Sequence, residues 1–226
     1  MLVEVPQVLS PEEVAHCHRV LEETDWVDGR VTAGFQSART KNNLQIPETA
    51  PQAQELQRLV LQALKRNPLF TTAALPFRIF PPLFNRYDEG MHFGAHVDNA
   101  LRFPPGGGAP LRTDVSVTLF LTDPADYEGG ELVVEDTFGT QSVKLEAGAA
   151  IVYPSSSLHR VEAVTRGSRW SSFFWIQSMV RDDGQRRLLF EMDQAISSLS
   201  ARLPDDPAAV QLTACYHNLL RRWAEV

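Results

Sequence analysis

Two residues that could share one metal ion lie close together near the middle of the sequence. His96 and Asp98 are two positions apart, and residues i and i+2 of a β-strand point to the same face. Two histidines and one carboxylate on one face, with open coordination positions, form the Fe(II) site of non-haem oxygenases. An isolated His-x-Asp is weak evidence, so this hypothesis needs a third ligand from elsewhere in the fold.

The third ligand has to come from the remaining histidines. His92 is four residues before His96, and about 13 Å of extended strand is too long a span for one ion. Three more lie in predicted helices. His16 and His18 are expected to face solvent, and His217 is expected to pack or cap. This leaves His159, at the start of a predicted strand, although alone it would read as an ordinary, partly buried histidine.

Arg169 opens another predicted strand, ten residues after His159. An arginine that enters an apolar strand needs an anionic partner, because an unpaired buried charge is costly. Guanidinium binds carboxylate through two parallel hydrogen bonds. The alternative for Arg169 alone is a strand-end side chain that reaches solvent, and the combination with the histidines and Asp98 favours the first interpretation.

Other polar segments give weaker signals. The cluster Arg39, Lys41, Asn42 and Asn43 is interpreted as a solvated loop rather than a substrate clamp. The stretch 104–108 is either an ordinary hairpin loop or a lid over the substrate. Residues 155–157 lack the Gly-x-Ser-x-Gly elbow, so no serine nucleophile is expected. No phosphate-binding glycine motif is present in the sequence.

The motifs around these residues resemble those of a known family. The pattern Tyr-x-x-Gly-x-x-Phe-x-x-His-x-Asp, from Tyr87 to Asp98, is similar to the first-ligand strand of prolyl 4-hydroxylases. His159 and Arg169 follow in the order found in Fe(II)/2-oxoglutarate-dependent dioxygenases. Further segments resemble the bacterial PKHD-type hydroxylases over nearly the whole chain: 80–87, 112–114, 129–132, 153–159, 175–178, 187–190 and 216–220.

The resemblance implies a role for each of these residues. His96, Asp98 and His159 would bind Fe(II), Arg169 would bind the distal carboxylate of 2-oxoglutarate, and Tyr87 would be a second donor to it. It also implies L-ascorbate as the reductant of the iron and a link to iron uptake. The carboxylate of Asp98 disfavours halogenation, for which related enzymes have a small residue at this position.

The expected reaction is hydroxylation of a small-molecule or peptidyl substrate, with formation of succinate and CO2. A peptidyl proline, a free amino acid and a siderophore-like molecule all remain open as substrates. The alternative function is a non-catalytic protein that senses or binds iron or 2-oxoglutarate. Arg169 separates the two hypotheses, because a pure metal sensor needs no anchor for 2-oxoglutarate.

The elements that must position these residues fall into three regions. Residues 1–75 are expected to be an N-terminal helical support region, and residues 76–178 read as about eight short strands with glycine turns. Residues 179–226 return to helical spacing as a hairpin. The prediction is an α+β chain with a mainly β core, a double-stranded β-helix (jelly roll) flanked by helices.

Two helix starts are marked in the N-terminal region. Ser10, Pro11 and Glu13 form a capping-box pattern with proline in the first turn. A second helix is predicted from Pro51. Its apolar residues recur at helical spacing at Ala53, Leu56, Val60 and Leu64.

Composition limits the partners. The chain has 226 residues and a net charge of -7, which argues against broad nucleic-acid or anionic-membrane binding. Cys17 and Cys215 match neither a disulfide framework nor a zinc site. The sequence shows no secretory signal and no 18-residue apolar run, so a cytoplasmic protein without a membrane partner is expected. A homodimer through the C-terminal helices is an alternative to a hairpin that packs on the barrel.

Overall fold

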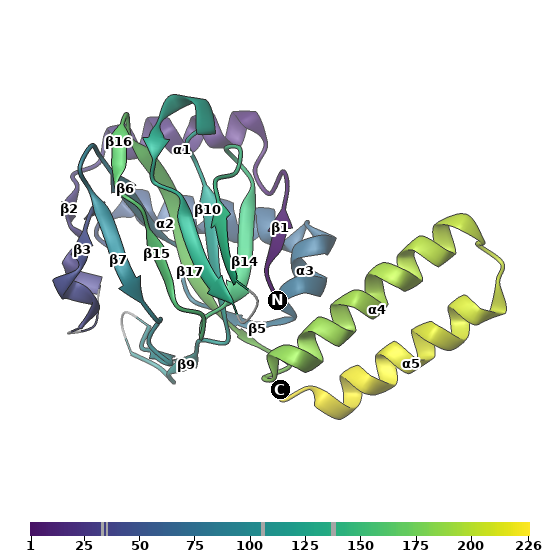
Figure 1. Ribbon diagram of the computed structural model, residues 1–226. Coiled ribbons are helices and arrows are strands. Elements are labelled where there is room, and N and C mark those ends of the chain that lie inside the picture. Colours follow the sequence, from purple (N-terminus) through teal and green to yellow (C-terminus); the bar gives the residue numbers. More distant parts are fainter. Residues whose placement is uncertain (33, 35, 105–106, 137–138) are drawn as a thin grey trace.

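The protein is described from a computed structural model, which places residues 1–32, 34, 36–104, 107–136 and 139–226. Within these residues two larger antiparallel sheets face each other, and helices lie against the outer side of one of them (Figure 1). The helices on this side are α1 (Pro11–Glu22), α2 (Pro51–Lys65) and α3 (Pro68–Ala74), and the chain ends with α4 (Asp183–Arg202) and α5 (Pro207–Trp223).

The larger sheet, here called the major sheet, contains the long strand that carries Arg169. In spatial order its strands are β1 (Val3–Val5), β14 (Ala150–Pro154), β10 (Val115–Phe120), β17 (Arg169–Ser178), β6 (Leu83–Tyr87), β4 (Leu44–Gln45) and β2 (Val27–Asp28), with β5 (Pro76–Ile79) also paired to β17. All of the pairings in this sheet are antiparallel.

The minor sheet carries both histidines of the predicted metal site. Its strands are, in order, β13 (Gly139–Val143), β12 (Leu132–Asp136), β15 (His159–Val161), β7 (His92–His96) and β3 (Lys41–Asn42). Two small ribbons complete the set: β11 (Glu128–Gly129) with β16 (Val164–Arg166), and β8 (Leu101–Arg102) with β9 (Leu111–Arg112).

Side chains of the major sheet alternate between two cores. On β10, Val115, Val117 and Leu119 pack toward helices α1, α2 and α3, whereas Phe120 packs between the sheets. This is the two-residue period of a strand that is buried on both faces. On β17 the same alternation places Arg169 and every second residue after it, through 175, along the space between the sheets.

Both helix starts predicted for the N-terminal region are confirmed. Ser10 caps α1: its hydroxyl accepts a hydrogen bond from the Glu13 amide, and the Glu13 carboxylate accepts one from the Ser10 amide. Helix α2 begins at Pro51, and its predicted apolar positions are buried: Ala53, Leu56, Val60 and Leu64.

The N-terminal region is less helical than predicted. It also contributes β1, β2, β3 and β4, which join the edges of the two sheets. These strands are two or three residues long, too short to show a period of two in the sequence. Residues 76–178 likewise form more strands than the eight or so predicted, because β8, β9 and β11 have only two residues each and the predicted run 158–164 is divided between β15 and β16.

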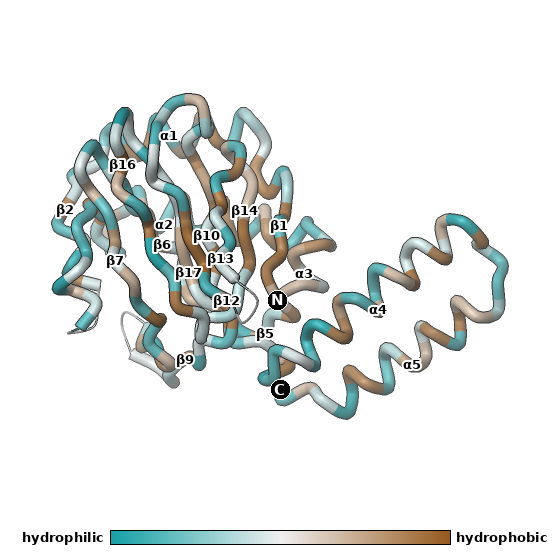
Figure 2. The backbone as a smooth tube through the Cα atoms, in the orientation of Figure 1, coloured by the Kyte–Doolittle hydropathy of each residue, from teal (hydrophilic) through white to brown (hydrophobic). Residues whose placement is uncertain are grey.

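The last two helices form a hairpin that extends away from the sheets (Figure 1). Leu189 and Tyr216 are buried between them, together with Leu75 and Val180 at the base of the hairpin. Figure 2 shows hydrophobic residues concentrated in the central strands, while hydrophobic and polar residues alternate along α4 and α5. No helix within the described ranges is both long and apolar enough to cross a membrane.

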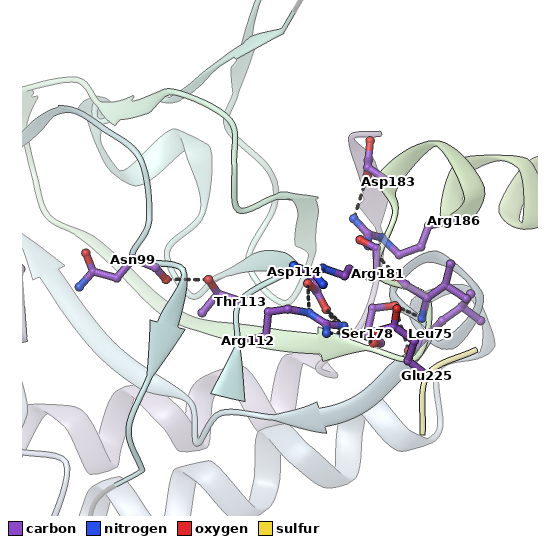
Figure 3. Close-up of polar contacts among 11 residues, drawn as sticks. Leu75, Asn99, Arg112, Thr113, Asp114, Ser178, Arg181, Asp183, Arg186 and Glu225 are labelled. Carbon is purple, nitrogen blue, oxygen red and sulfur yellow. Dashed lines mark hydrogen bonds and ion pairs between the residues drawn. The ribbon is translucent and has the colours of Figure 1, made fainter. Parts of the chain in front are cut away.

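A polar network attaches the base of this hairpin to the start of β10 and the end of β17 (Figure 3). Arg112 donates to both carboxylate oxygens of Asp114, at 2.7 and 3.1 Å, and pairs with Glu225 near the C-terminus at 3.2 Å. Asp114 also accepts from the Ser178 amide at 2.9 Å. The neighbouring Thr113 donates its hydroxyl to the Asn99 carbonyl at 2.6 Å. The network therefore joins the chain end to the segment that follows the predicted metal ligands.

Candidate active site

Three predicted ligands lie together between the sheets. His159 on β15 is directly opposite His96 on β7 in the strand register, and Asp98 follows two residues after the end of β7. One ligand atom from each of the three lies within 4.8 Å of the other two. Asp98 Oδ2 is 3.8 Å from His159 Nε2. The described part of the chain contains no second cluster of this kind.

Backbone carbonyls orient both imidazole rings. Nδ1 of His96 lies 2.8 Å from the Gly94 carbonyl oxygen, and Nδ1 of His159 lies 3.0 Å from that of Ser157. A carbonyl can only accept, so Nδ1 carries the proton in each neutral ring and Nε2 presents its lone pair, as a metal ligand must. Burial, and then the neighbouring His159, lower the pKa of His96 to about 4. The neutral form therefore prevails near pH 7.

Asp98 is held by a pair of serines from the opposite sheet. Ser116 on β10 donates its hydroxyl to Asp98 Oδ2 at 2.5 Å, and its oxygen lies 2.7 Å from the Ser155 hydroxyl. Both serines are buried. The contact leaves Oδ1 of Asp98 available and restricts the rotation of the carboxylate. A carboxylate that is held in this way is oriented to bind a metal.

Arg169 is a buried cation with donors to spare. Its side chain is 1% exposed, and Nη1 donates to the Ser171 hydroxyl at 2.7 Å, which in turn donates to Asn85 at 2.5 Å. Nε and Nη2 are buried and find no hydrogen-bond partner among the residues that the structure describes. These two donors form one edge of the guanidinium, which fits the two oxygens of a carboxylate. Since an unpaired buried charge is costly, the site fits an anionic ligand at this point.

The metal cluster and Arg169 line one cleft of about 720 Å³, including its open mouth. Tyr87, the predicted second donor, is directly opposite Arg169 in the β6–β17 register and also lines the cleft. Burial raises the pKa of Tyr87 to about 12, so its hydroxyl keeps the proton and can donate it. A mostly apolar cleft with a few convergent polar groups is typical of a site for a small molecule.

The sequence interpretation missed several cleft residues. Lys41 and Asn43, assigned to a solvated loop, are 6% and 3% exposed, and Lys41 lines the cleft, as does Arg102. Lys41 is buried because β3 pairs with β7, a long-range contact that local composition does not reveal. The serine at position 116 interrupts an apolar strand, and this polar residue at an inward position was the available signal.

The remaining histidines lie away from the cluster. His92 is exposed at the start of β7 and lies outside the cluster, in line with the prediction that it is too far from His96 to share one ion. His16 pairs with Glu55, and His217 is an exposed residue whose ring contacts Tyr216. The prediction of a solvated side chain is wrong for His18, whose ring stacks on Trp170 and whose Nε2 lies 2.6 Å from the Leu121 carbonyl. The proposed lid at 104–108 includes residues 105 and 106, which lie outside the described residues.

A fold of two facing sheets, with a histidine–carboxylate cluster beside a buried arginine, defines the class of Fe(II)- and 2-oxoglutarate-dependent oxygenases. Residues 82–177 match the 2OG-Fe(II) oxygenase superfamily, and residues 183–225 match the PKHD-type hydroxylase C-terminal domain. A PKHD-type hydroxylase of Methylobacterium nodulans is 65% identical over 227 residues and covers 100% of both chains. The chain belongs to the PKHD-type hydroxylase family of the 2OG-Fe(II) oxygenases and is an enzyme of that type.

Solved structures show the same fold at low identity. A prolyl-4-hydroxylase of Pseudomonas putida has a TM-score of 0.53 at 20% identity, with 78% of this chain and 92% of that chain covered. HygX from Streptomyces hygroscopicus, solved with nickel and 2-oxoglutarate bound, has a TM-score of 0.51 at 16% identity, with 76% and 81% covered. The α+β architecture with a jelly-roll core is therefore shared with these enzymes.

Proposed function

We propose that His96, Asp98 and His159 bind Fe(II), that Arg169 binds the distal carboxylate of 2-oxoglutarate with Tyr87 as a second donor, and that the enzyme hydroxylates a small-molecule or peptidyl substrate. The observation that carries this proposal is the buried edge of Arg169, with two donors and no partner, in the same cleft as the three potential ligands. The donor set is the two-histidine, one-carboxylate set of non-haem Fe(II) oxygenases. HygX, which has the same fold, holds 2-oxoglutarate and a divalent metal.

In this proposal the protein supplies placement and a dry cleft. When bound, Fe(II) and 2-oxoglutarate supply an O2-dependent oxidation that yields succinate, CO2 and the hydroxylated substrate. The Gly94 and Ser157 carbonyls keep the two Nε2 lone pairs directed at the metal position, and Ser116 keeps the Asp98 carboxylate in place. Arg169 fixes the far end of the cosubstrate, which orients its keto acid toward the metal position.

The test is O2-dependent conversion of labelled 2-oxoglutarate to succinate, measured with and without Fe(II). The wild-type enzyme should turn over slowly without a substrate, and Asp98→Ala should abolish the reaction, because two imidazoles alone hold Fe(II) weakly. Asp205→Ala, at an exposed position in the turn between α4 and α5, is the control and should retain the activity. Equal rates for wild type and Asp98→Ala would overturn the assignment and favour a protein that only senses or binds iron or 2-oxoglutarate.

The family resemblance carries further proposals. L-Ascorbate would keep the iron reduced, the reaction would be linked to iron uptake, and the protein would act in the cytoplasm without nucleic-acid or membrane partners. The proposed role of ascorbate is tested by the dependence of turnover number on ascorbate. The proposed link to iron uptake is tested by the growth of a deletion strain under iron limitation. Growth and siderophore uptake equal to those of the parent strain would argue against the link to iron.

A homodimer through the C-terminal helices is also proposed. In α4, α5 and the turn between them, three large apolar side chains are more than half exposed: Leu188, Leu203 and Val210. Light scattering after size-exclusion chromatography should give twice the chain mass, and Leu188→Asp together with Val210→Asp should give the mass of one chain. A wild-type protein with the mass of one chain at micromolar concentration would contradict the dimer.

A further inference from the structure

Two cations that the proposed chemistry does not use lie in the outer part of the cleft. Lys41 is opposite Phe93 in the β3–β7 register, and its Nζ lies 5.2 Å from the Phe93 ring centroid and 5.6 Å from that of Phe173. Arg102, at the end of β8, lies over Trp175, with 4.0 Å from its guanidinium carbon to the ring centroid. Aromatic rings therefore support both cations and hold them at the cleft wall.

Neither cation has an acidic partner within ion-pair distance. Lys41 Nζ donates to the Thr32 hydroxyl at 2.9 Å, and Arg102 Nη1 donates to the Thr32 carbonyl at 3.2 Å. Across the described residues neither forms an ion pair within 4.0 Å, although 13 other ion pairs are found. The carboxylates whose charges reach Arg102 are Glu48 and Asp98. In the proposed function Asp98 is committed to the metal. Burial and then the neighbouring Arg102 lower the pKa of Lys41 to about 7, so Arg102 is the permanent cation of this wall. With Asp98 committed to the metal, only Glu48 among the described carboxylates offsets the charge of Arg102. Because a buried cation is costly without a close counter-charge, the cleft wall is built to receive an anion.

The cosubstrate cannot be that anion if Arg169 holds it. Trp175, which supports Arg102, lies six residues beyond Arg169 on the same continuous strand, or about 20 Å along it at 3.3 Å per residue. The five carbons of 2-oxoglutarate are joined by four bonds of about 1.5 Å each and span at most about 6 Å. In the proposed function both carboxylates of 2-oxoglutarate are already used, one at Arg169 and one at the metal position. An anion at Arg102 is therefore a second molecule, and its place in the cleft is that of the substrate.

We infer that the substrate is an organic acid whose carboxylate pairs with Arg102 and Lys41. The inference rests on the proposed function and adds the chemical class of the molecule that is hydroxylated. The guanidinium has four N–H donors beyond the one bonded to Thr32, and its planar fork matches a carboxylate. Phe93, Phe173 and Trp175 line the same cleft, so the body of the acid is apolar where it passes these rings.

The experiment compares pairs of probes that differ only in charge. N-acetyl amino acids with aliphatic or aromatic side chains are titrated alongside their primary amides, which have the same size and shape. Calorimetry is done under anaerobic conditions on the full chain with Fe(II) and saturating 2-oxoglutarate, so that Arg169 is occupied. The acids should bind at least tenfold more tightly than the amides, and Arg102→Gln should reduce this ratio to about one.

Matched variants separate charge recognition from a structural role. Arg102→Lys keeps the charge and should retain part of the preference, and Lys41→Gln should reduce it. Arg166→Gln, an exposed arginine paired with Glu128 away from the cleft, should leave the preference unchanged. The affinity for 2-oxoglutarate should be the same in Arg102→Gln as in the wild type, since Arg102 does not hold the cosubstrate.

Equal binding of acids and amides, including no measurable binding of either, would overturn the inference. An acid preference that survives in both Arg102→Gln and Lys41→Gln would also overturn it. Failure of the proposed function is recognised separately, as absence of 2-oxoglutarate binding to the wild type. In that case the acid–amide comparison is repeated without iron in Arg169→Gln, where Arg169 cannot capture the acid, and it still decides the inference.

Discussion

At the scale of single residues, the site combines groups whose charge and hydrogen bonds are incomplete within the protein. Arg169 has two buried donors without partners, and Asp98 has one oxygen held by Ser116. Such arrangements lower stability unless a ligand completes them. Variants of these two residues can therefore be used to measure ligand binding separately from turnover.

Replacing Arg169 with glutamine should weaken 2-oxoglutarate binding by about 2–5 kcal/mol, typical for truncating one partner of a buried charge pair. Fe(II) binding should largely survive, because Arg169 is not one of the proposed ligands. Anaerobic calorimetry with Fe(II) and with 2-oxoglutarate measures both affinities. The control is Arg160→Gln, because Arg160 on β15 pairs with Glu135 and Glu162. Normal 2-oxoglutarate affinity in Arg169→Gln would show that another residue anchors the cosubstrate.

The lowered pKa of His96 predicts how stability depends on pH. Its pKa is about 4 in the metal-free folded protein, because burial and then His159 disfavour the imidazolium, and near the ordinary value of about 6.5 in the unfolded chain. Between these two values the unfolded chain binds more protons, so the free energy of unfolding falls as the pH drops from 6.5 toward 4. His96→Gln should therefore lose less stability than the wild type between pH 7 and pH 5.

Urea unfolding of the metal-free protein at the two pH values measures this difference. His92→Gln, at an exposed histidine on the same strand, is the matched control and should behave like the wild type. The pKa assignment is wrong if the loss of stability is the same in His96→Gln and in the wild type.

At the scale of elements, a two-residue strand brings one residue to the cleft, and a helix cap stabilises the layer behind the major sheet. Strand β3 has two residues and places Lys41 in the cleft. Helix α1 lies behind the major sheet with its first turn closed by a capping box. The cap also carries an ion pair between Glu13 and Arg66 after α2, which ties the two helices together.

Removing this cap should affect stability without affecting chemistry. Ser10→Ala should lower the free energy of unfolding by about 1 kcal/mol, because the Glu13 amide loses its acceptor. Chemical denaturation measures the change, and Ser197→Ala at an exposed position inside α4 is the control. Iron-dependent succinate formation at 25 °C should be unchanged in Ser10→Ala. A stability equal to that of the wild type would mean that the cap contributes nothing.

At the scale of the whole molecule, the C-terminal hairpin is joined to the oxygenase core through a small polar network (Figure 3). Asp114 is the centre of this network, with a side chain that is 6% exposed, and Glu225 at its edge is 57% exposed. A buried pair and an exposed pair thus share the same arginine, Arg112. The two carboxylates can be compared because burial determines how much an ion pair contributes.

Asp114→Asn should lower the free energy of unfolding by about 1–3 kcal/mol, since it weakens the hydrogen bonds from Arg112 and the Ser178 amide. Glu225→Gln should cost less than about 1 kcal/mol, because its ion pair is exposed to water. Urea unfolding of both variants at the same salt concentration provides the comparison. Equal losses in the two variants would contradict the argument from burial.

Local sequence determined two helix starts and the longer strands of residues 76–178, and it singled out the residues that form the histidine–carboxylate cluster. Ser10 and Pro51 mark helix starts because caps and prolines act within one turn. His96 and Asp98 could be paired because a strand repeats every two residues. For His159 and Arg169 the order of motifs along the chain identified the residues, and the structure then brought them into one cleft.

Only the tertiary structure decided what surrounds these residues. Lys41 is buried because β3 pairs with β7, and Arg102 is placed on Trp175 by the β8–β9 ribbon and the end of β17. His18 is held against Trp170, which comes from a strand about 150 positions later in the sequence. These contacts join segments far apart in the chain, and a pattern of neighbouring residues contains no information on which distant strand will cover a polar side chain. The proposed metal ligands could therefore be predicted from the sequence, whereas the positive charge of the outer cleft depended on the fold.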